Sequence, residues 1–159
     1  KKPIVAANWK MYKTPQEGVS FVSEISNLLL DKEKPSIIFC PPFTSLFHMN
    51  EMISDLDFSL GAQNVYFEKD GAFTGEISMS MLKSCGVQYV IVGHSERRHV
   101  FNESNKDTNK KLHTVLENDI VPFGAPLSLI KLVRFLVSIP VIPTILFFFN
   151  QSSKCFKDL

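Results

Sequence analysis

The sequence has no excess of charge of either sign. Its 159 residues include 17 Lys and Arg against 16 Asp and Glu, which gives a formal net charge of +1 at pH 7. The basic residues are scattered along the chain. Nucleic-acid-binding proteins concentrate positive charge on one face or stripe. We therefore expect no nucleic acid partner.

Cysteine is scarce, and its spacing fits no metal site. The cysteines are Cys40, Cys85 and Cys155, and an odd number argues against a disulfide framework. Cys40 lies in an apolar segment and Cys85 at a predicted helix end, which favours buried thiols over nucleophiles. We expect no metal and no cofactor. Because the chain opens on an apolar segment without a secretory signal, we predict a cytoplasmic location.

The sequence also lacks an uninterrupted apolar run of membrane-spanning length. A spanning helix needs about 20 consecutive apolar residues. Residues 127–149 are rich in Leu, Ile, Val and Phe, but charged residues and prolines interrupt them. The interrupting residues are Lys131, Arg134, Pro140 and Pro143. This argues against a membrane span, although a membrane-adherent tail stays a third hypothesis. A helix over 127–137 followed by a strand also fits the pattern.

Short apolar segments alternate with helical patterns over the first 123 residues. The Thr14-Pro15-Gln16-Glu17 segment is a capping box with proline at the first helical position. Ser78 caps a later helix, for which Gly86 provides a left-handed end. Such alternation predicts a parallel sheet with right-handed crossovers, either a barrel or a doubly wound sheet. The predicted strands span residues 3–8, 36–40, 57–62, 88–92 and 119–123.

Two absences narrow this fold class. The sequence has neither a Walker lysine loop nor a Gly-x-Gly-x-x-Gly turn, which removes the usual doubly wound nucleotide-binding proteins. A closed (β/α)8 barrel takes roughly 250 residues. A chain of 159 residues therefore holds only part of one.

The most informative segment is a buried strand over residues 89–92 that ends at Gly93. His94, Ser95 and Glu96 follow at the start of a predicted helix. The carboxyl ends of parallel strands are where α/β enzymes place their chemistry. The structural alternative is that Ser95 is a helix N-cap and His94 a turn residue. The three residues cannot form a nucleophilic triad, because consecutive side chains do not face one another.

A second segment has the same design. Residues 3–11 form an apolar strand that ends in Asn8 and Lys10. Together with Gly61-Ala62-Gln63-Asn64 and the segment 71–78, these motifs resemble the triosephosphate isomerase family in order and spacing. The resemblance covers residues 1 to about 123. It implies an α/β fold of the TIM-type (β/α)8 barrel family, of which four to five βα units are present as one domain over residues 1–123.

The resemblance also implies an activity and its residues. The family interconverts glyceraldehyde 3-phosphate and dihydroxyacetone phosphate in glycolysis, so the implied partner is a small phosphorylated triose. His94 matches the family's electrophile, a histidine kept neutral near a helix N-terminus, for which the family is the established case. Lys10 matches the cation that faces the anionic substrate, and Asn8 a substrate-binding amide. Glu96 matches the partner of Lys10.

The long connection over residues 63–77 resembles the family's dimer loop. A loop of this length in a compact domain is usually functional. Thr74, Gly75 and Glu76 match the part that inserts beside the neighbouring subunit's site, so the resemblance implies a homodimer. It also predicts that Glu76 and Lys111 pair with Arg97 beneath the site.

The resemblance ends near Phe123. Residues 124–159 are expected to be a divergent hydrophobic tail of unknown structure, without the family's catalytic glutamate and glycine-rich phosphate turns. The tail contains no glutamate, and its one aspartate is Asp158. Its bias toward Phe, Ile, Leu, Lys, Asn and Ser favours an out-of-frame or truncated reading of the gene.

We therefore predict a triosephosphate isomerase half-site without the base, and a chain that is inactive as written. The alternative is a non-catalytic half-barrel remnant or interaction module. Because a half-barrel leaves its first and last strands with unpaired edges, we also expect self-association.

Overall fold

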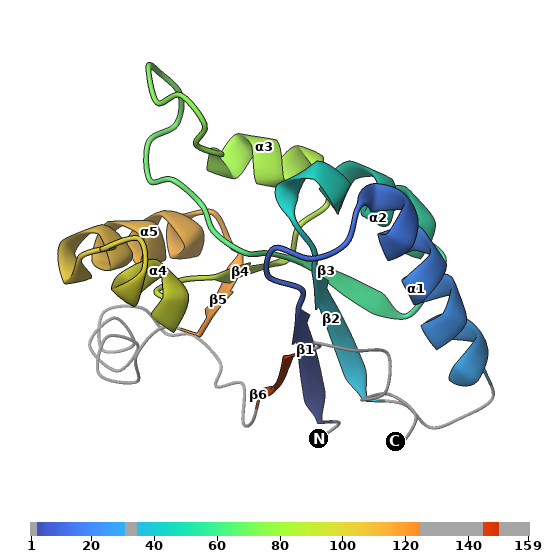
Figure 1. The fold of residues 1–159 in the computed structure, drawn as a ribbon. Helices are drawn as coiled ribbons and strands as arrows, with labels where there is room; N and C mark the ends of the chain where they lie inside the picture. Colours follow the sequence, from blue (N-terminus) through green and yellow to red (C-terminus); the bar gives the residue numbers. More distant parts are fainter. Residues whose placement is uncertain (1–2, 31–34, 125–144, 150–159) are drawn as a thin grey trace.

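The computed structural model describes residues 3–30, 35–124 and 145–149 (Figure 1). These residues form six strands and the helices that connect the first five. The strands are β1 Ile4–Asn8, β2 Ser36–Cys40, β3 Phe58–Ala62, β4 Tyr89–Ile91, β5 Val121–Phe123 and β6 Ile145–Phe149. The helices are α1 Pro15–Leu28, the 3-10 turn η1 Phe43–Ser45, α2 Leu46–Ile53, α3 Met79–Ser84, α4 Ser95–His99 and α5 Asn105–Glu117.

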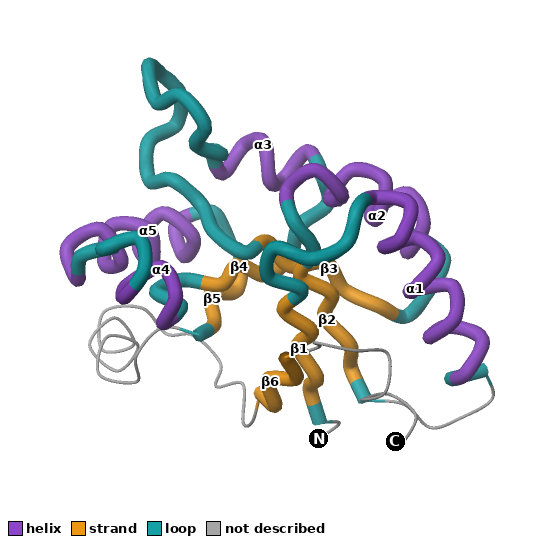
Figure 2. Tube along the Cα trace, in the orientation of Figure 1, coloured by secondary structure: helices purple, strands orange, loops and turns teal. Residues whose placement is uncertain are grey.

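The strand order distinguishes a barrel from a doubly wound sheet. All pairs are parallel, and the order is β5-β4-β3-β2-β1-β6. A doubly wound sheet reverses its order at a switch point and carries helices on both faces. Here β1 to β5 lie in chain order, and the helices wrap around the outside of a curled sheet (Figure 2). The predicted half of a TIM-type barrel is confirmed.

The predicted helix signals are found at the first and third helices. Thr14 Oγ1 accepts from the Glu17 N–H at 3.4 Å, and the Glu17 carboxylate accepts from the Thr14 N–H at 2.7 Å. Ser78 Oγ accepts from the Met81 N–H at 3.4 Å. Gly86 follows α3 at φ 69°, a left-handed conformation that favours glycine. These local signals fix where α1 and α3 begin and where α3 ends.

Two apolar clusters hold the sheet. The larger cluster lies between the sheet and its helices and centres on Trp9, Phe21 and Phe39, whose rings meet edge to face at 5.8 to 6.5 Å. Such aromatic pairs contribute beyond the area they bury. The smaller cluster consists of Ala6, Ile38, Cys40, Ile91 and Phe123. Because Trp9 is 1% exposed, the chain is held firmly at the carboxyl end of β1.

One expectation about the sheet edges is wrong. The first strand was predicted to have an unpaired edge, but β6 pairs with it in parallel, from Ile4 opposite Ile145 to Asn8 opposite Phe149. In a closed barrel the last strand takes this place beside the first. The possible helix over 127–137 lies outside the described residues. In the part of the chain that is described, no helix is long and apolar enough to cross a membrane.

The opposite edge belongs to β5. Within the described ranges this strand pairs only with β4, and Pro122 stands opposite Val90 in the register. Proline has no N–H to donate to a further strand, so it is found at sheet edges. Pro122 therefore makes the outer side of β5 a poorer template for association than the side of β1 that pairs with β6.

Removing β6 should increase self-association. In a chain ending at residue 124, β1 takes the place of β6 as the edge strand, and the N–H and C=O groups of β1 that pair with β6 are left to template strand pairing. We expect light scattering at matched concentrations to show larger particles for this chain than for the full chain. A chain ending at residue 149 keeps β6 and is the control. A monodisperse monomer from the chain ending at 124 would contradict the expectation.

Candidate active site

Polar residues follow two of the parallel strands at the same edge of the sheet. Asn8 is the last residue of β1, and Lys10 follows it after the buried Trp9. His94 comes soon after β4, beyond Gly93 at φ 67°. The left-handed glycine turns the chain from the strand directly into α4. Parallel pairing therefore places these side chains at the carboxyl edge of the sheet.

His94, and not Ser95, is the N-cap of α4. The Nδ1 atom of His94 accepts from the Glu96 N–H at 3.2 Å. The structural alternative, in which Ser95 caps the helix, does not hold, because the imidazole takes over the capping role of a short polar side chain. In the neutral ring an accepting Nδ1 leaves the proton on Nε2. The cap thus sets the tautomer of the predicted electrophile.

The structure brings Lys10, His94 and Glu96 together. Lys10 Nζ lies 2.7 Å from Glu96 Oε1, and His94 Nδ1 lies 3.5 Å from Glu96 Oε2. Asn8 joins the group through the backbone, because its Oδ1 accepts from the Lys10 N–H at 3.0 Å. The side chain of Glu96 is 43% exposed, so the cluster opens to solvent.

Burial is the main reason that His94 favours the neutral form. Desolvation of the ring lowers the pKa of His94. The charge of Glu96 acts in the opposite direction, and the charge of Lys10 adds to the lowering. His94 also stands at the start of α4, as expected from the sequence, and burial of the ring adds a second cause for the neutral form.

Thr74, Gly75 and Glu76 lie apart from this cluster. They belong to the long connection between β3 and α3, which projects from the body of the molecule (Figure 1). All three residues are exposed. Within one copy of the chain the structure does not bring them to Lys10 or His94.

Arg97 on α4 takes part in a buried ionic network, but its carboxylate is not the one that the resemblance implies. Glu103, not Glu76, joins Arg97 and Lys111. Arg97 Nε donates to Glu103 Oε2 at 2.8 Å, and Lys111 Nζ donates to the same oxygen. Asn64 completes the network by accepting from Lys111 Nζ at 2.9 Å.

The network is a well-shielded one. The side chains of Glu103 and Lys111 are 4% and 5% exposed. Burial raises the pKa of Glu103, but hydrogen bonds from Lys111 and Arg97, with their charges, outweigh it and hold that pKa below its ordinary value. Glu103 directly precedes the helix cap Ser104, a position where a glutamate is typically exposed. No local feature of the sequence therefore indicates that Glu103 is buried in an ionic network.

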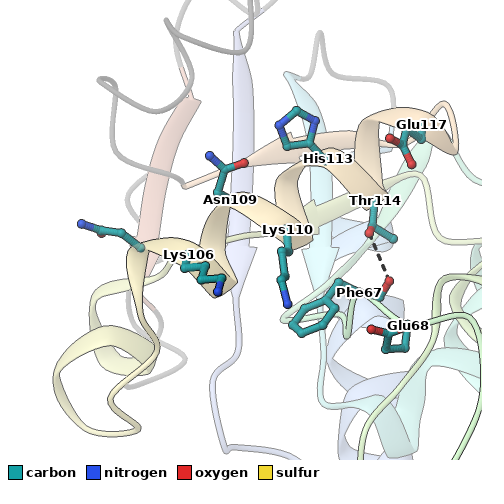
Figure 3. Close-up of a pocket in the computed structure, with 9 residues that line it drawn as sticks. Phe67, Glu68, Lys106, Asn109, Lys110, His113, Thr114 and Glu117 are labelled. Carbon is teal, nitrogen blue, oxygen red and sulfur yellow. Dashed lines mark hydrogen bonds between the residues drawn. The ribbon is translucent and has the colours of Figure 1, made fainter.

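The groove beside α5 is a separate feature (Figure 3). Its wall contains Phe67, over whose ring Lys110 Nζ lies at 4.2 Å from the centroid. Thr114 Oγ1 donates to the Phe67 carbonyl at 3.3 Å. None of the predicted site residues lines the groove. Its contacts attach the start of the projecting connection to α5.

The cysteines within the described residues have no role in the cluster. Cys40 is buried in the smaller apolar cluster, and burial raises the pKa of its thiol. Cys85 is partly buried at the end of α3. Cys155 lies outside the described residues. No group of three His, Cys, Asp or Glu side chains in the described ranges is placed as metal ligands would be.

The fold and the cluster define the class of protein: the first part of a TIM-type barrel with a cluster of polar side chains at the carboxyl ends of its strands. The profile of the triosephosphate isomerase family matches residues 3–124. The chain belongs to the triosephosphate isomerase family.

Individual relatives agree with this assignment. Over 122 residues the chain is 50% identical to the triosephosphate isomerase of Dictyoglomus turgidum, a match that covers 77% of this chain and 49% of the relative. It is 49% identical over 112 residues to that of Carboxydothermus hydrogenoformans, covering 70% and 45%. For Aquifex aeolicus the identity is 48% over 119 residues, covering 75% and 48%. The chain thus spans about half the length of the relatives it matches.

The pKa of His94 should respond in opposite directions to its two neighbours. Glu96→Gln removes a raising charge and should lower that pKa further, whereas Lys10→Ala should raise it. An NMR titration of the His94 ring protons measures both shifts. Because the folded state favours the neutral ring, His94 costs stability as the pH falls below its unfolded pKa. Lys83→Ala on α3 is the control, and equal shifts from all three variants would contradict the prediction.

Loss of the Glu103 carboxylate should destabilise the fold. Glu103→Gln leaves Lys111 buried without its ion-pair partner, which we expect to cost about 2 to 3 kcal/mol in the free energy of unfolding. Glu103 has a lowered folded pKa, so its contribution is present above its unfolded pKa and is lost as the pH falls through the folded value. The variant should therefore lose less stability than the wild type on acidification.

Urea unfolding at pH 7 and in the acid range measures this effect. Glu117→Gln, an exposed position at the end of α5, the helix that carries Lys111, is the matched control. A Glu103→Gln chain as stable as the control would show that the network contributes nothing.

Proposed function

We propose that this chain carries the electrophile and the cation of a triosephosphate isomerase site, without the base. The observation that carries the proposal is the cluster of Lys10, Glu96 and His94 at the carboxyl edge of the sheet. The family assignment supports a small phosphorylated triose as the ligand. In this proposal residues 1–123 form the domain that holds the half-site, and 124–159 a divergent tail.

The roles follow from the chemistry of the three groups. Isomerisation moves a proton between adjacent carbons and passes through an enediolate whose oxygen carries developing negative charge. A neutral His94 with its proton on Nε2 can donate to that oxygen. Lys10 places a fixed positive charge beside an anionic ligand. With Asn8 Oδ1 engaged by the backbone, its amide nitrogen is the group left to bind the substrate.

In this proposal, residues 124–159 do not provide the base that the proton transfer needs. Residues 124–159 contain no glutamate, and the only aspartate there is Asp158. Loss of a positioned proton acceptor costs on the order of 10²- to 10⁴-fold in rate. Missing phosphate donors weaken substrate positioning further. We therefore propose that the chain binds a triose phosphate weakly and does not turn it over.

A homodimer is part of the same proposal. Met11 is 94% exposed beside the site, and Phe101 is 65% exposed after α4. In this proposal the second copy covers both side chains, which removal of apolar surface from water favours. The projecting loop with Thr74, Gly75 and Glu76 gives such a surface a segment that can reach a second copy. A cytoplasmic location also remains a prediction.

The second candidate is a non-catalytic half-barrel that acts as an interaction module. The same exposed Met11 and Phe101 favour it, because an interaction surface needs no complete active site. Ligand binding separates the two candidates. For an interaction module we expect no binding of a triose phosphate that depends on Lys10.

Turnover and binding should be measured on the same purified chain. We expect no isomerisation of glyceraldehyde 3-phosphate above background, and weak binding of dihydroxyacetone phosphate that Lys10→Ala abolishes. His94→Ala should weaken binding less, because a neutral donor contributes less than a charge toward an anion. Lys83→Ala is the control for nonspecific loss of charge.

Two results would contradict this proposal. Turnover well above background that both Lys10→Ala and His94→Ala abolish would show that a base is present elsewhere in the chain or in a second copy. Binding that is absent, or equal in Lys10→Ala and the wild type, would favour the interaction module.

A further inference from the structure

Lys10 has an unusual backbone. Its φ is 54°, in the left-handed region that residues other than glycine, asparagine and aspartate rarely adopt. Such conformations persist where surrounding contacts impose them, and they cluster at functional sites. The contacts that impose this one are therefore informative about the site.

Gln63 is one of those contacts. It follows β3 directly, and its Nε2 donates to the Lys10 carbonyl at 2.9 Å and to the Cys40 carbonyl at 2.9 Å. The two bonds use both hydrogens of one amide nitrogen. A single side chain thus ties the residue after Trp9 to the end of β2 and to the end of β3.

The backbone of Lys10 is fixed from both sides. Asn8 Oδ1 accepts its N–H at 3.0 Å, while Gln63 donates to its C=O. The Trp9 N–H donates to the Cys40 carbonyl at 3.1 Å and continues the ladder between β1 and β2. Lysine has a long and flexible side chain, so the place where its ammonium group lies depends on where its backbone is held.

We propose that Gln63 is a positioning residue that directs Lys10 toward the Glu96 and His94 cluster. The role rests on the proposed function, since Lys10 matters there as the cation that faces the ligand. Gln63 acts through the backbone carbonyl of Lys10. Its amide holds the turn in the conformation from which Nζ meets Glu96 Oε1 at 2.7 Å.

The test follows Lys10 itself by NMR, through the signal of its side-chain ε-methylene group, assigned with Lys10→Arg. Gln63→Met keeps the side-chain length and removes both donors, and Gln63→Glu keeps the shape but offers only acceptors. In both variants we expect the Lys10 signal to move toward its position in Glu96→Gln. Gln88→Met is the matched control. Gln88 directly precedes β4, and its side chain also bonds to the backbone of another strand, since its Oε1 accepts from the Leu60 N–H at 3.3 Å. It should leave the Lys10 signal unchanged.

Affinity gives the second measurement. We expect Gln63→Met to weaken dihydroxyacetone phosphate binding about 3- to 10-fold, the effect of one lost hydrogen bond. The control Gln88→Met should leave this affinity unchanged. Thermal melting curves identify a temperature at which every variant is folded, and the NMR and binding measurements are made at that temperature. If neither Gln63 variant folds, slow exchange of both Gln63 side-chain amide protons in the wild type supports the role, and fast exchange overturns it.

The outcomes separate this inference from the proposed function. An unchanged Lys10 signal in a folded Gln63→Met chain overturns the positioning role, as does an equal change in Gln88→Met. If the wild type binds no triose phosphate while the Lys10 signal moves as expected, the proposed function fails and the positioning of Lys10 by Gln63 stands.

Discussion

Parallel pairing of the strands is the constraint on which the site depends. Residues far apart in the sequence meet only because β1 to β4 end at the same edge of the sheet. Asn8 and Lys10 come from the first of these ends, Gln63 from the third and His94 from the fourth. The backbone hydrogen bonds of the parallel ladders fix the spacing of neighbouring strands, so this spacing also sets how far apart the polar residues at the strand ends lie. An ion pair between Lys10 and Glu96 is possible because the backbone has already brought the two close.

Much of this arrangement could be predicted from the sequence. The capping box at Thr14 and Glu17 and the glycine at 86 are local signals, and local signals specify where helices begin and end. The strand positions followed from short apolar runs. The motifs around Asn8 and His94 resemble the family closely enough to predict that their side chains share one site. For the caps and the strands the relevant physics acts within a few residues, whereas the shared site was implied by the resemblance.

What could not be predicted depends on contacts across the fold. Glu103 can be buried because Arg97 and Lys111 both pair with it, and the residues next to it in the sequence do not indicate these contacts. The capping role of His94 depends on the ring turning back onto the Glu96 N–H. β6 beside β1 is a pairing between the two ends of the chain, which short-range patterns do not specify. Gln63 belongs to the same group, since one carbonyl that it bonds belongs to Lys10, after β1, and the other to Cys40, at the end of β2.

The buried Trp9 has a consequence for how this molecule can be observed. It is the only tryptophan in the chain, and it sits between Asn8 and Lys10 with 1% of its surface exposed. Its indole packs against Phe21 and Phe39. The intrinsic fluorescence of the protein is therefore a local signal, emitted from the wall of the site. Any loosening of the turn that carries Lys10 lets water reach the indole and shifts its emission to longer wavelength, without a label and without a ligand.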